Sequence, residues 1–127
     1  MRLLLDTQVF LWFLGDDARM PQGARAAVGA GENVVLVSAA SVWEIAIKAS
    51  IGRLTIPRPE VGRLPALIEA AGFEELPVLA RHAALVHELP GHHRDPFDRL
   101  LVAQARAEGL TLVTTDPMVR SYDVSVL

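Results

Sequence analysis

The stretch HHRDPFDRLLVAQARAEGLTLVTTD, residues 92–116, joins a helix to a strand and decides how the fold is read. Apolar residues recur at helical spacing in DPFDRLLVAQARAEG (95–109), and a glycine ends the run, as is typical of a helix C-terminus. LTLVTTD (110–116) alternates and then ends on an acid, which is typical of a strand. A helix followed directly by a strand indicates one unit of a parallel α/β sheet.

The same alternation extends over the rest of the chain. Further strands are predicted from short apolar runs, at RLLLD (2–6), NVVLVS (33–38), FEELPV (73–78) and VSVL (124–127). Helices are predicted from period and caps, at TQVFLWFLG (7–15), PQGARAAVGAG (21–31), SAASVWEIAIKASIG (38–52), RLPALIEAAG (63–72) and LARHAALVHELP (79–90), with RLTIPRPEVG (53–62) as a connection. We therefore predict an α/β fold, a three-layer α/β/α sandwich with a mostly parallel central sheet, as one domain over residues 1–127.

Composition excludes several classes of protein. Hydrophobic residues make up 51% of the chain, which indicates a packed core. The absence of cysteine excludes disulfide frameworks, thiolate zinc sites and cysteine nucleophiles. The first apolar run is too short for a signal peptide, and no run of about 18 apolar residues predicts a membrane helix. We expect a cytoplasmic protein with no membrane partner.

The net charge of −3 does not indicate nucleic-acid binding by itself. Eleven of the 12 basic residues are arginines, which suit phosphate oxygens, although a genome rich in G and C gives the same bias. If four acids are set aside as metal ligands, the remaining 11 acids nearly balance the 12 bases. A polyanionic substrate is therefore compatible with the rest of the surface.

Four acids are placed where a parallel sheet brings them together. Asp6 and Asp116 end predicted strands, Glu44 lies in the early turns of the helix after the second strand, and Asp98 lies in the first turn of its helix. The carboxyl ends of parallel strands lie along one edge, where open α/β folds build their sites. Crowded carboxylates repel one another unless a cation neutralises them, and Mg²⁺ or Mn²⁺ prefers such oxygen ligands.

Each acid also has a purely structural interpretation. Asp95 before a proline is a good helix N-cap, and the negative charge of Asp98 in the first turn then interacts favourably with the helix dipole. Asp6 and Asp116 can cap the helix and the turn that follow them, while Glu44 can simply pair with the lysine four residues later. Asp95 remains divided between a cap and an accessory metal ligand.

The motifs LLLDT, SAASVWEIAIK, HRDPFDRLLVAQA and LVTTD resemble those of the PIN-domain ribonucleases, in particular the toxins of VapBC-type toxin–antitoxin pairs. The resemblance runs over nearly the whole chain. It implies that the family's acidic quartet, which is both catalytic and metal-binding, falls on Asp6, Glu44, Asp98 and Asp116, with Asp95 accessory. A hydroxyl near the metal would come from Thr114 or Thr115.

The resemblance further implies a Mg²⁺-dependent endoribonuclease, with Mn²⁺ able to substitute, that hydrolyses RNA phosphodiesters with a metal-bound water. It also implies an antitoxin partner that silences the enzyme, and a homodimer. Arg94, Arg99 and Lys48 flank the acids and could meet RNA phosphates; the alternatives are that Lys48 only pairs with Glu44 and that Arg99 only solvates a helix.

The four histidines are predicted to stay outside the chemistry. His92 and His93 are interpreted as the lip of a loop, and His82 and His87 as structural residues of a helix. FLWFL (10–14) is interpreted as core, with a homodimer face as the alternative.

Other classes of protein fit the chain less well. A phosphoacceptor receiver domain is disfavoured because no lysine follows residue 48, and a haloacid-dehalogenase-like phosphatase because DTQ lacks its second aspartate. Neither a Walker loop nor a Gly-x-Ser-x-Gly elbow occurs. The remaining alternative is a non-catalytic α/β protein-interaction module whose acids are helix caps.

Overall fold

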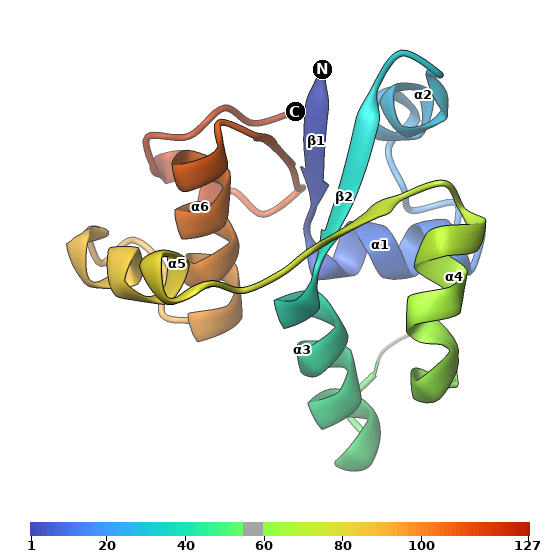
Figure 1. The fold of residues 1–127 in the computed structure, drawn as a ribbon, viewed down its shortest axis with the longest axis horizontal. Helices are drawn as coiled ribbons and strands as arrows, with labels where there is room; N and C mark the ends of the chain where they lie inside the picture. Colours follow the sequence, from blue (N-terminus) through green and yellow to red (C-terminus); the bar gives the residue numbers. More distant parts are fainter. Residues whose placement is uncertain (55–59) are drawn as a thin grey trace.

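The computed structural model describes residues 1–54 and 60–127, and its centre is a parallel sheet (Figure 1). Four strands pair in the order β3-β2-β1-β4, and every pairing is parallel. The strands are β1 (Arg2–Leu5), β2 (Val34–Ser38), β3 (Glu74–Leu76) and β4 (Thr111–Val113). The predicted parallel sheet is thus confirmed, and the carboxyl ends of its strands lie at one edge.

Helices cover both faces of this sheet. They are α1 (Thr7–Leu14), α2 (Gln22–Gly29), α3 (Ala39–Ser50), α4 (Leu64–Ala70), α5 (Ala80–Leu85) and α6 (Pro96–Glu108), with short 3-10 turns η1 (Val61–Arg63), η2 (Val86–Glu88) and η3 (Val119–Ser121). In Figure 1, α5 and α6 lie on one side of the strands, and α1, α2 and α4 lie on the other. This arrangement confirms the three layers.

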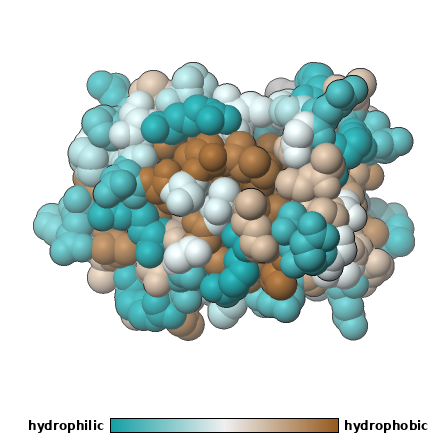
Figure 2. All heavy atoms as spheres, turned by 90° about the horizontal axis from the view of Figure 1, so that it is seen from above, coloured by the Kyte–Doolittle hydropathy of each residue, from teal (hydrophilic) through white to brown (hydrophobic). Residues whose placement is uncertain are grey.

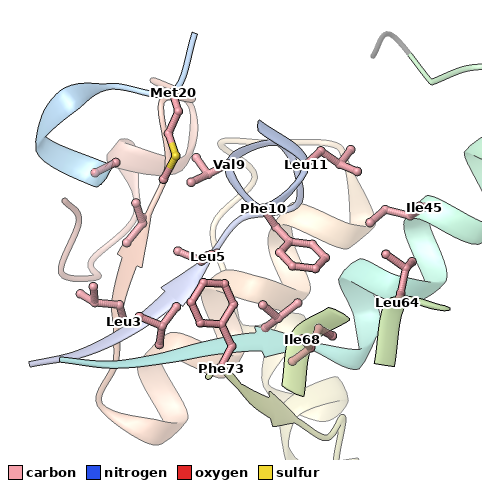
Figure 3. Packing of buried hydrophobic residues seen from close by; sticks show 14 residues of the cluster. Leu3, Leu5, Val9, Phe10, Leu11, Met20, Ile45, Leu64, Ile68 and Phe73 are labelled. Atoms are coloured by element: carbon pink, nitrogen blue, oxygen red, sulfur yellow. The ribbon is translucent and has the colours of Figure 1, made fainter. Parts of the chain in front are cut away.

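Successive residues of β1 point to opposite layers, because side chains alternate along a strand. Leu3 and Leu5 pack with Phe10 of α1 and Ile68 of α4 in one core (Figure 3). Leu4 packs instead with the α6 residues of a second core. Burial on both faces explains why RLLL is continuously apolar rather than alternating.

The first helix belongs to the core, as predicted for FLWFL. Phe10 and Leu11 are buried, and the three residues that follow pack against the same cluster while remaining partly exposed. Among the described helices, none combines the length and the apolar character that crossing a membrane requires.

Three predicted elements are wrong in extent. Residues 124–127 do not form a strand: a single bridge joins Leu112 to Val126, because β4 is itself too short to extend the ladder. The helix predicted at 79–90 ends at Leu85 and tightens into the 3-10 turn η2 before Pro90. The helix predicted at 63–72 is preceded by η1, and part of the connection at 53–62 lies outside the described residues.

The two edges of the sheet have opposite character. Figure 2 looks from above onto the end that holds the amino ends of β1 and β2, where a hydrophobic band crosses a hydrophilic surface. Met1 and Val34 are exposed at this edge, where the Val34 amide donates to the Met1 carbonyl. The predicted acidic residues all lie toward the opposite, carboxyl edge, because they follow the ends of the strands.

Candidate metal centre

Asp6 follows the last residue of β1 and serves two functions. One carboxylate oxygen, Oδ1, accepts the Val9 amide at 2.8 Å and caps α1. The other, Oδ2, accepts the hydroxyl of Thr114, the residue after β4. Asp6 is 6% exposed, so β1 and β4 together hold a buried carboxylate at the carboxyl edge.

Glu44 reaches the same place from α3. Ser38, at the end of β2, accepts the Ala40 amide and is the N-cap of α3. Thr7 donates to Ser41 at 2.9 Å and ties α1 to α3. Glu44 is 4% exposed: its Oε2 accepts from Lys48 at 2.6 Å, but its buried Oε1 has no hydrogen-bond partner among the described residues.

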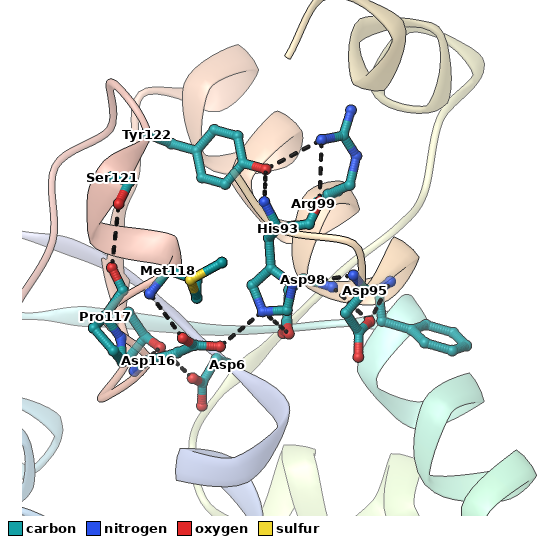
Figure 4. Close-up of polar contacts among 12 residues, drawn as sticks. Asp6, His93, Asp95, Asp98, Arg99, Asp116, Pro117, Met118, Ser121 and Tyr122 are labelled. Atoms are coloured by element: carbon teal, nitrogen blue, oxygen red, sulfur yellow. Dashed lines mark hydrogen bonds and ion pairs between the residues drawn. The ribbon is translucent and has the colours of Figure 1, made fainter. Parts of the chain in front are cut away.

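Asp95 and Asp98 have different roles at the start of α6. Asp95 Oδ1 accepts the amides of Phe97 at 2.8 Å and Asp98 at 3.3 Å, so Asp95 is the N-cap. Asp98, one turn further along the helix, directs its carboxylate into the acidic cluster (Figure 4). The cap thus orients the helix that carries Asp98.

Asp116 also combines a cap with a place in the cluster. Its Oδ1 accepts the Met118 amide at 2.8 Å, which forms the predicted turn after β4. Its backbone N–H donates to the Thr114 hydroxyl, and that hydroxyl in turn donates to Asp6. The carboxylates of Asp6 and Asp116 are therefore connected through one threonine.

The four acids and Asp95 line one cavity of about 300 Å³, so residues separated by 110 positions meet there. Lys48 and Arg53 also line it and are its cationic wall. Arg53 was not among the predicted residues; it follows the end of α3, and its amide bonds the Lys48 carbonyl.

The electrostatics of the cavity disfavour fully charged acids. Burial, opposed in part by the bonds from Thr114 and Val9, raises the pKa of Asp6 from 3.8 to about 6. Burial and the neighbouring charges of Asp95 and Glu44 raise the pKa of Asp98 from 3.8 to about 7. Two acids with raised pKa values thus share the cavity with a buried carboxylate oxygen that has no partner among the described residues. This combination fits a hard divalent cation with oxygen ligands.

Another unpartnered group faces the same cavity. Gln8, from the first turn of α1, lines the cavity, and its buried amide nitrogen has no acceptor among the residues that the structure describes. An amide N–H at this position suits an oxygen-rich ligand, whereas Glu44 Oε1 suits a cation or an N–H or O–H donor.

The five residues predicted to contact substrate have different positions. Thr114 is buried and donates to the Asp6 carboxylate, whereas Thr115, the next residue, is exposed. Lys48 pairs with Glu44 at the cavity wall, and Arg94, between His93 and Asp95 in the sequence, is exposed. Of the two predicted threonines, the structure brings only Thr114 to the acids.

Arg99 does more than solvate its helix, which was the structural alternative for this residue. Its guanidinium donates to the carbonyls of Pro90 at 2.9 Å and Val86 at 3.1 Å, and to the hydroxyl of Tyr122 at 3.1 Å. These bonds join α6 to the loop that precedes it. Arg99 is thus committed to holding that loop.

His93 is the residue that sequence reasoning missed. Its Nε2 lies 2.8 Å from Asp116 Oδ2 and 3.1 Å from Asp98 Oδ2, so the prediction that His93 stays at the loop lip is wrong (Figure 4). A histidine two residues before the helix-capping Asp95 was the available signal. His92 packs instead against the ring of Tyr122, and His82 is buried in the structural role predicted for it.

Comparison with known proteins gives a consistent result. Residues 3–124 match the PIN domain family. The chain is 32% identical over 122 residues to ribonuclease VapC22 of Mycobacterium tuberculosis, covering 94% of this chain and 91% of the relative. It is also 40% identical over 60 residues to ribonuclease VapC16 of the same organism, covering 47% and 43%.

Solved structures show the same fold at low identity. VapBC2 from Rickettsia felis, bound to a DNA fragment from its promoter, superposes with a TM-score of 0.72 at 16% identity, covering 100% of this chain and 98% of that one. FitAcB from Neisseria gonorrhoeae superposes with a TM-score of 0.62 at 22% identity, covering 98% and 96%.

Proposed function

Since the chain belongs to the PIN-domain family and, within it, to the VapC ribonucleases, we propose that it is a Mg²⁺-dependent endoribonuclease and the toxin of a type II toxin–antitoxin pair. Its substrate would be RNA, and the reaction the hydrolysis of a phosphodiester. Mn²⁺ would substitute for Mg²⁺, because both ions prefer oxygen ligands.

One observation carries this proposal: the buried Oε1 of Glu44 has no partner among the described residues, in a cavity that four aspartates also line. A carboxylate oxygen that serves only as part of a surface ion pair would face water instead. Leaving a buried acceptor without a donor costs about 1–3 kcal/mol, which a bound cation would offset.

The quartet Asp6, Glu44, Asp98 and Asp116 would hold the ion. When bound, a divalent ion supplies an activated water and compensates the charge that develops on the phosphate. Asp95 would act as an accessory by capping the helix that carries Asp98.

The remaining residues would orient these acids and the substrate. Thr114 donates to one oxygen of Asp6, and Lys48 donates to one oxygen of Glu44. These bonds fix the orientation of the two carboxylates. Arg53 and Lys48 on the cavity wall, with Arg94 outside it, would attract the phosphate backbone.

We also propose a cognate antitoxin as partner and a homodimer as the assembly. The support for a protein partner is that the structural neighbours are named VapBC2, which is bound to a DNA fragment from its promoter, and FitAcB.

A non-catalytic interaction module is the second candidate, because Asp6, Asp95 and Asp116 all cap a helix or a turn. Metal binding separates the two candidates, because a set of acids that serves only as helix and turn caps would not bind a divalent cation tightly and saturably.

The test is a calorimetric titration of Mn²⁺ into the full chain, beside Asp98→Asn and Asp95→Asn. Saturable binding that Asp98→Asn abolishes and Asp95→Asn only weakens is expected, followed by Mg²⁺-dependent cleavage of a panel of structured RNAs. If the wild-type chain neither binds Mn²⁺ nor cleaves RNA, the interaction module is the better description.

A further inference from the structure

His93 bridges two acids that come from different parts of the fold. Asp98 lies on α6 and Asp116 lies after β4, and the imidazole Nε2 is within 3.1 Å of one oxygen of each. Ligand atoms of these three residues lie close enough together to hold a metal ion. The question is whether His93 is itself a ligand or acts on the acids.

The protonation of the ring answers this question. The Asp95 backbone N–H donates to His93 Nδ1 at 3.0 Å. A backbone amide can only donate, so Nδ1 carries the lone pair, and the proton of the neutral imidazole is on Nε2. Nε2 therefore faces the carboxylates as an N–H donor, without a lone pair for a metal.

The backbone of His93 is held on both sides. Its N–H donates to the Tyr122 hydroxyl at 2.8 Å, and its carbonyl accepts from Arg99 at 3.4 Å. Arg99 also donates to Tyr122 and to the carbonyls of Pro90 and Leu89. Tyr122 is buried, so the ring of His93 is presented to the acids from a rigid loop.

We infer that His93 is a positioning residue, whose Nε2–H holds Asp98 and Asp116 side by side as a preformed ligand pair. Without this donor, two carboxylates at this separation would repel each other, and the loop after β4 would be free to move Asp116 away from α6. Arg99 and Tyr122 form the support that keeps the donor in place. The inference rests on the proposed metal-dependent function.

Replacing His93 by glutamine or by asparagine tests the contacts of its two ring nitrogens separately. In His93→Gln the side-chain amide extends to the position of Nε2 and can donate to the acids. In His93→Asn it ends near the position of Nδ1, where it can still accept the Asp95 amide but cannot reach the acids. The two variants thus lose opposite halves of the contacts made by His93.

The experiment measures Mn²⁺ affinity and metal-free thermal unfolding for both variants of the full chain. We expect His93→Asn to bind Mn²⁺ about 10- to 100-fold more weakly than wild type, as is typical when the group that orients a metal ligand is removed. His93→Gln should stay within a few-fold of wild type. The order of thermal stability should be reversed, with His93→Asn at least as stable as His93→Gln, because it keeps the turn around Asp95.

A purely structural role predicts instead that affinity follows stability, and this outcome would overturn the inference. Equal and severe loss in both variants would also overturn it, because the ring nitrogen would then be a ligand. Wild-type affinity in both would show that no donor is needed. If the wild-type chain itself fails to bind Mn²⁺, the proposed function fails first and the inference with it.

Tyr122→Phe extends the test to the support. It removes one hydroxyl and leaves the acids and His93 unchanged, so a few-fold weaker Mn²⁺ affinity is expected. Affinity equal to that of wild type would remove Tyr122 from the positioning scheme.

Discussion

Two histidines in this fold carry the same tautomer but face different surroundings. His82 Nδ1 accepts the Leu79 amide at 3.0 Å, and His93 Nδ1 accepts the Asp95 amide at 3.0 Å, so both present Nε2–H to carboxylates. His82 meets Glu108, one partly exposed acid, at 2.8 Å. His93 meets two acids of the cavity. The same hydrogen-bonding pattern therefore occurs in two clusters. We call the cluster around His82 and Glu108 the closed cluster and the acidic cavity beside His93 the open cluster.

The closed cluster satisfies its own groups. Bonds from His82 and Arg81 outweigh desolvation and lower the pKa of Glu108 below 4.5. Ser38 donates to Gln104 at 2.6 Å, and Gln104 donates to the Pro77 carbonyl at 3.2 Å. In the cavity, by contrast, burial raises the pKa of two aspartates and one glutamate oxygen lacks a partner among the described residues. Buried polar groups that are mutually satisfied stabilise a fold, whereas those left unsatisfied indicate a ligand.

The largest difference in RNA cleavage is expected when the same substitution, Glu to Gln, is made in each of the two clusters. Glu44→Gln should reduce Mg²⁺-dependent RNA cleavage on the order of 10³-fold, because ligation by the carboxylate supplies several kcal/mol of charge stabilisation. The matched control Glu108→Gln should leave cleavage within a few-fold of wild type. Initial rates on one cleaved RNA measure both, and a comparable loss in the two variants would contradict the contrast between the clusters.

The next largest effect is a loss of folding stability, expected when His82 of the closed cluster is replaced. His82 is 0% exposed, so His82→Ala leaves a cavity and removes the acceptor of the Leu79 amide. We expect a loss of about 3 kcal/mol in the free energy of unfolding. Urea unfolding measures it, and Mn²⁺ affinity under native conditions should be unchanged. Weakened Mn²⁺ binding at full folding would show that the two clusters are coupled.

A smaller effect of opposite sign is expected from the open cluster. The folded-state pKa values of Asp6 and Asp98 are about 6 and about 7, above their ordinary 3.8. The folded chain then binds more protons than the unfolded chain between about pH 4 and pH 7, so the metal-free protein should lose stability as the pH rises through this window.

Asp6→Asn removes one of the two buried acids while leaving an oxygen to cap α1. We expect it to raise metal-free stability at pH 8 by about 2 kcal/mol and to flatten the pH dependence. Urea unfolding with a chelator at several pH values provides the measurement. Stability that rises with pH in the wild-type protein would contradict the raised pKa values.

The smallest effect is expected at Asp95, where a cap and an accessory ligand are separable. Asp95→Asn keeps an oxygen for the Phe97 amide, so stability should change by only a few tenths of a kcal/mol. Asp95→Ala should cost about 1 kcal/mol, because the cap is lost. If both variants weaken Mn²⁺ binding equally and severely, Asp95 is a principal ligand rather than a cap.

The acids could be placed from sequence because their positions follow from local rules. Asp6 and Asp116 end apolar runs, and Asp98 begins a helix, so a parallel sheet alone brings them to one edge. The orientation of Glu44 likewise follows from its place in the second turn of α3. These features need no knowledge of tertiary contacts.

The missed features depend on contacts between distant residues. The loop position of His93 is set by Tyr122 and Arg99, which are 29 and 6 residues away, and no periodicity reveals such bonds. Arg99 was therefore misread as a surface cation. The choice between Thr114 and Thr115 depends on which of two successive residues points inward at the end of β4, and a one-residue ambiguity in a strand reverses that answer.

The centre joins the beginning of the chain to its end. The Asp6 amide donates to the Val113 carbonyl at 3.0 Å, and Thr114 bonds the Asp6 carboxylate. Because a chain is synthesised from its N-terminus, Asp6 leaves the ribosome long before β4, the strand that precedes Thr114. A growing chain that stops before β4 lacks Thr114, Asp116 and one of the two strands that pair with β1. The acidic cluster can therefore assemble only after synthesis has passed residue 116, when β4 is available to pair with β1.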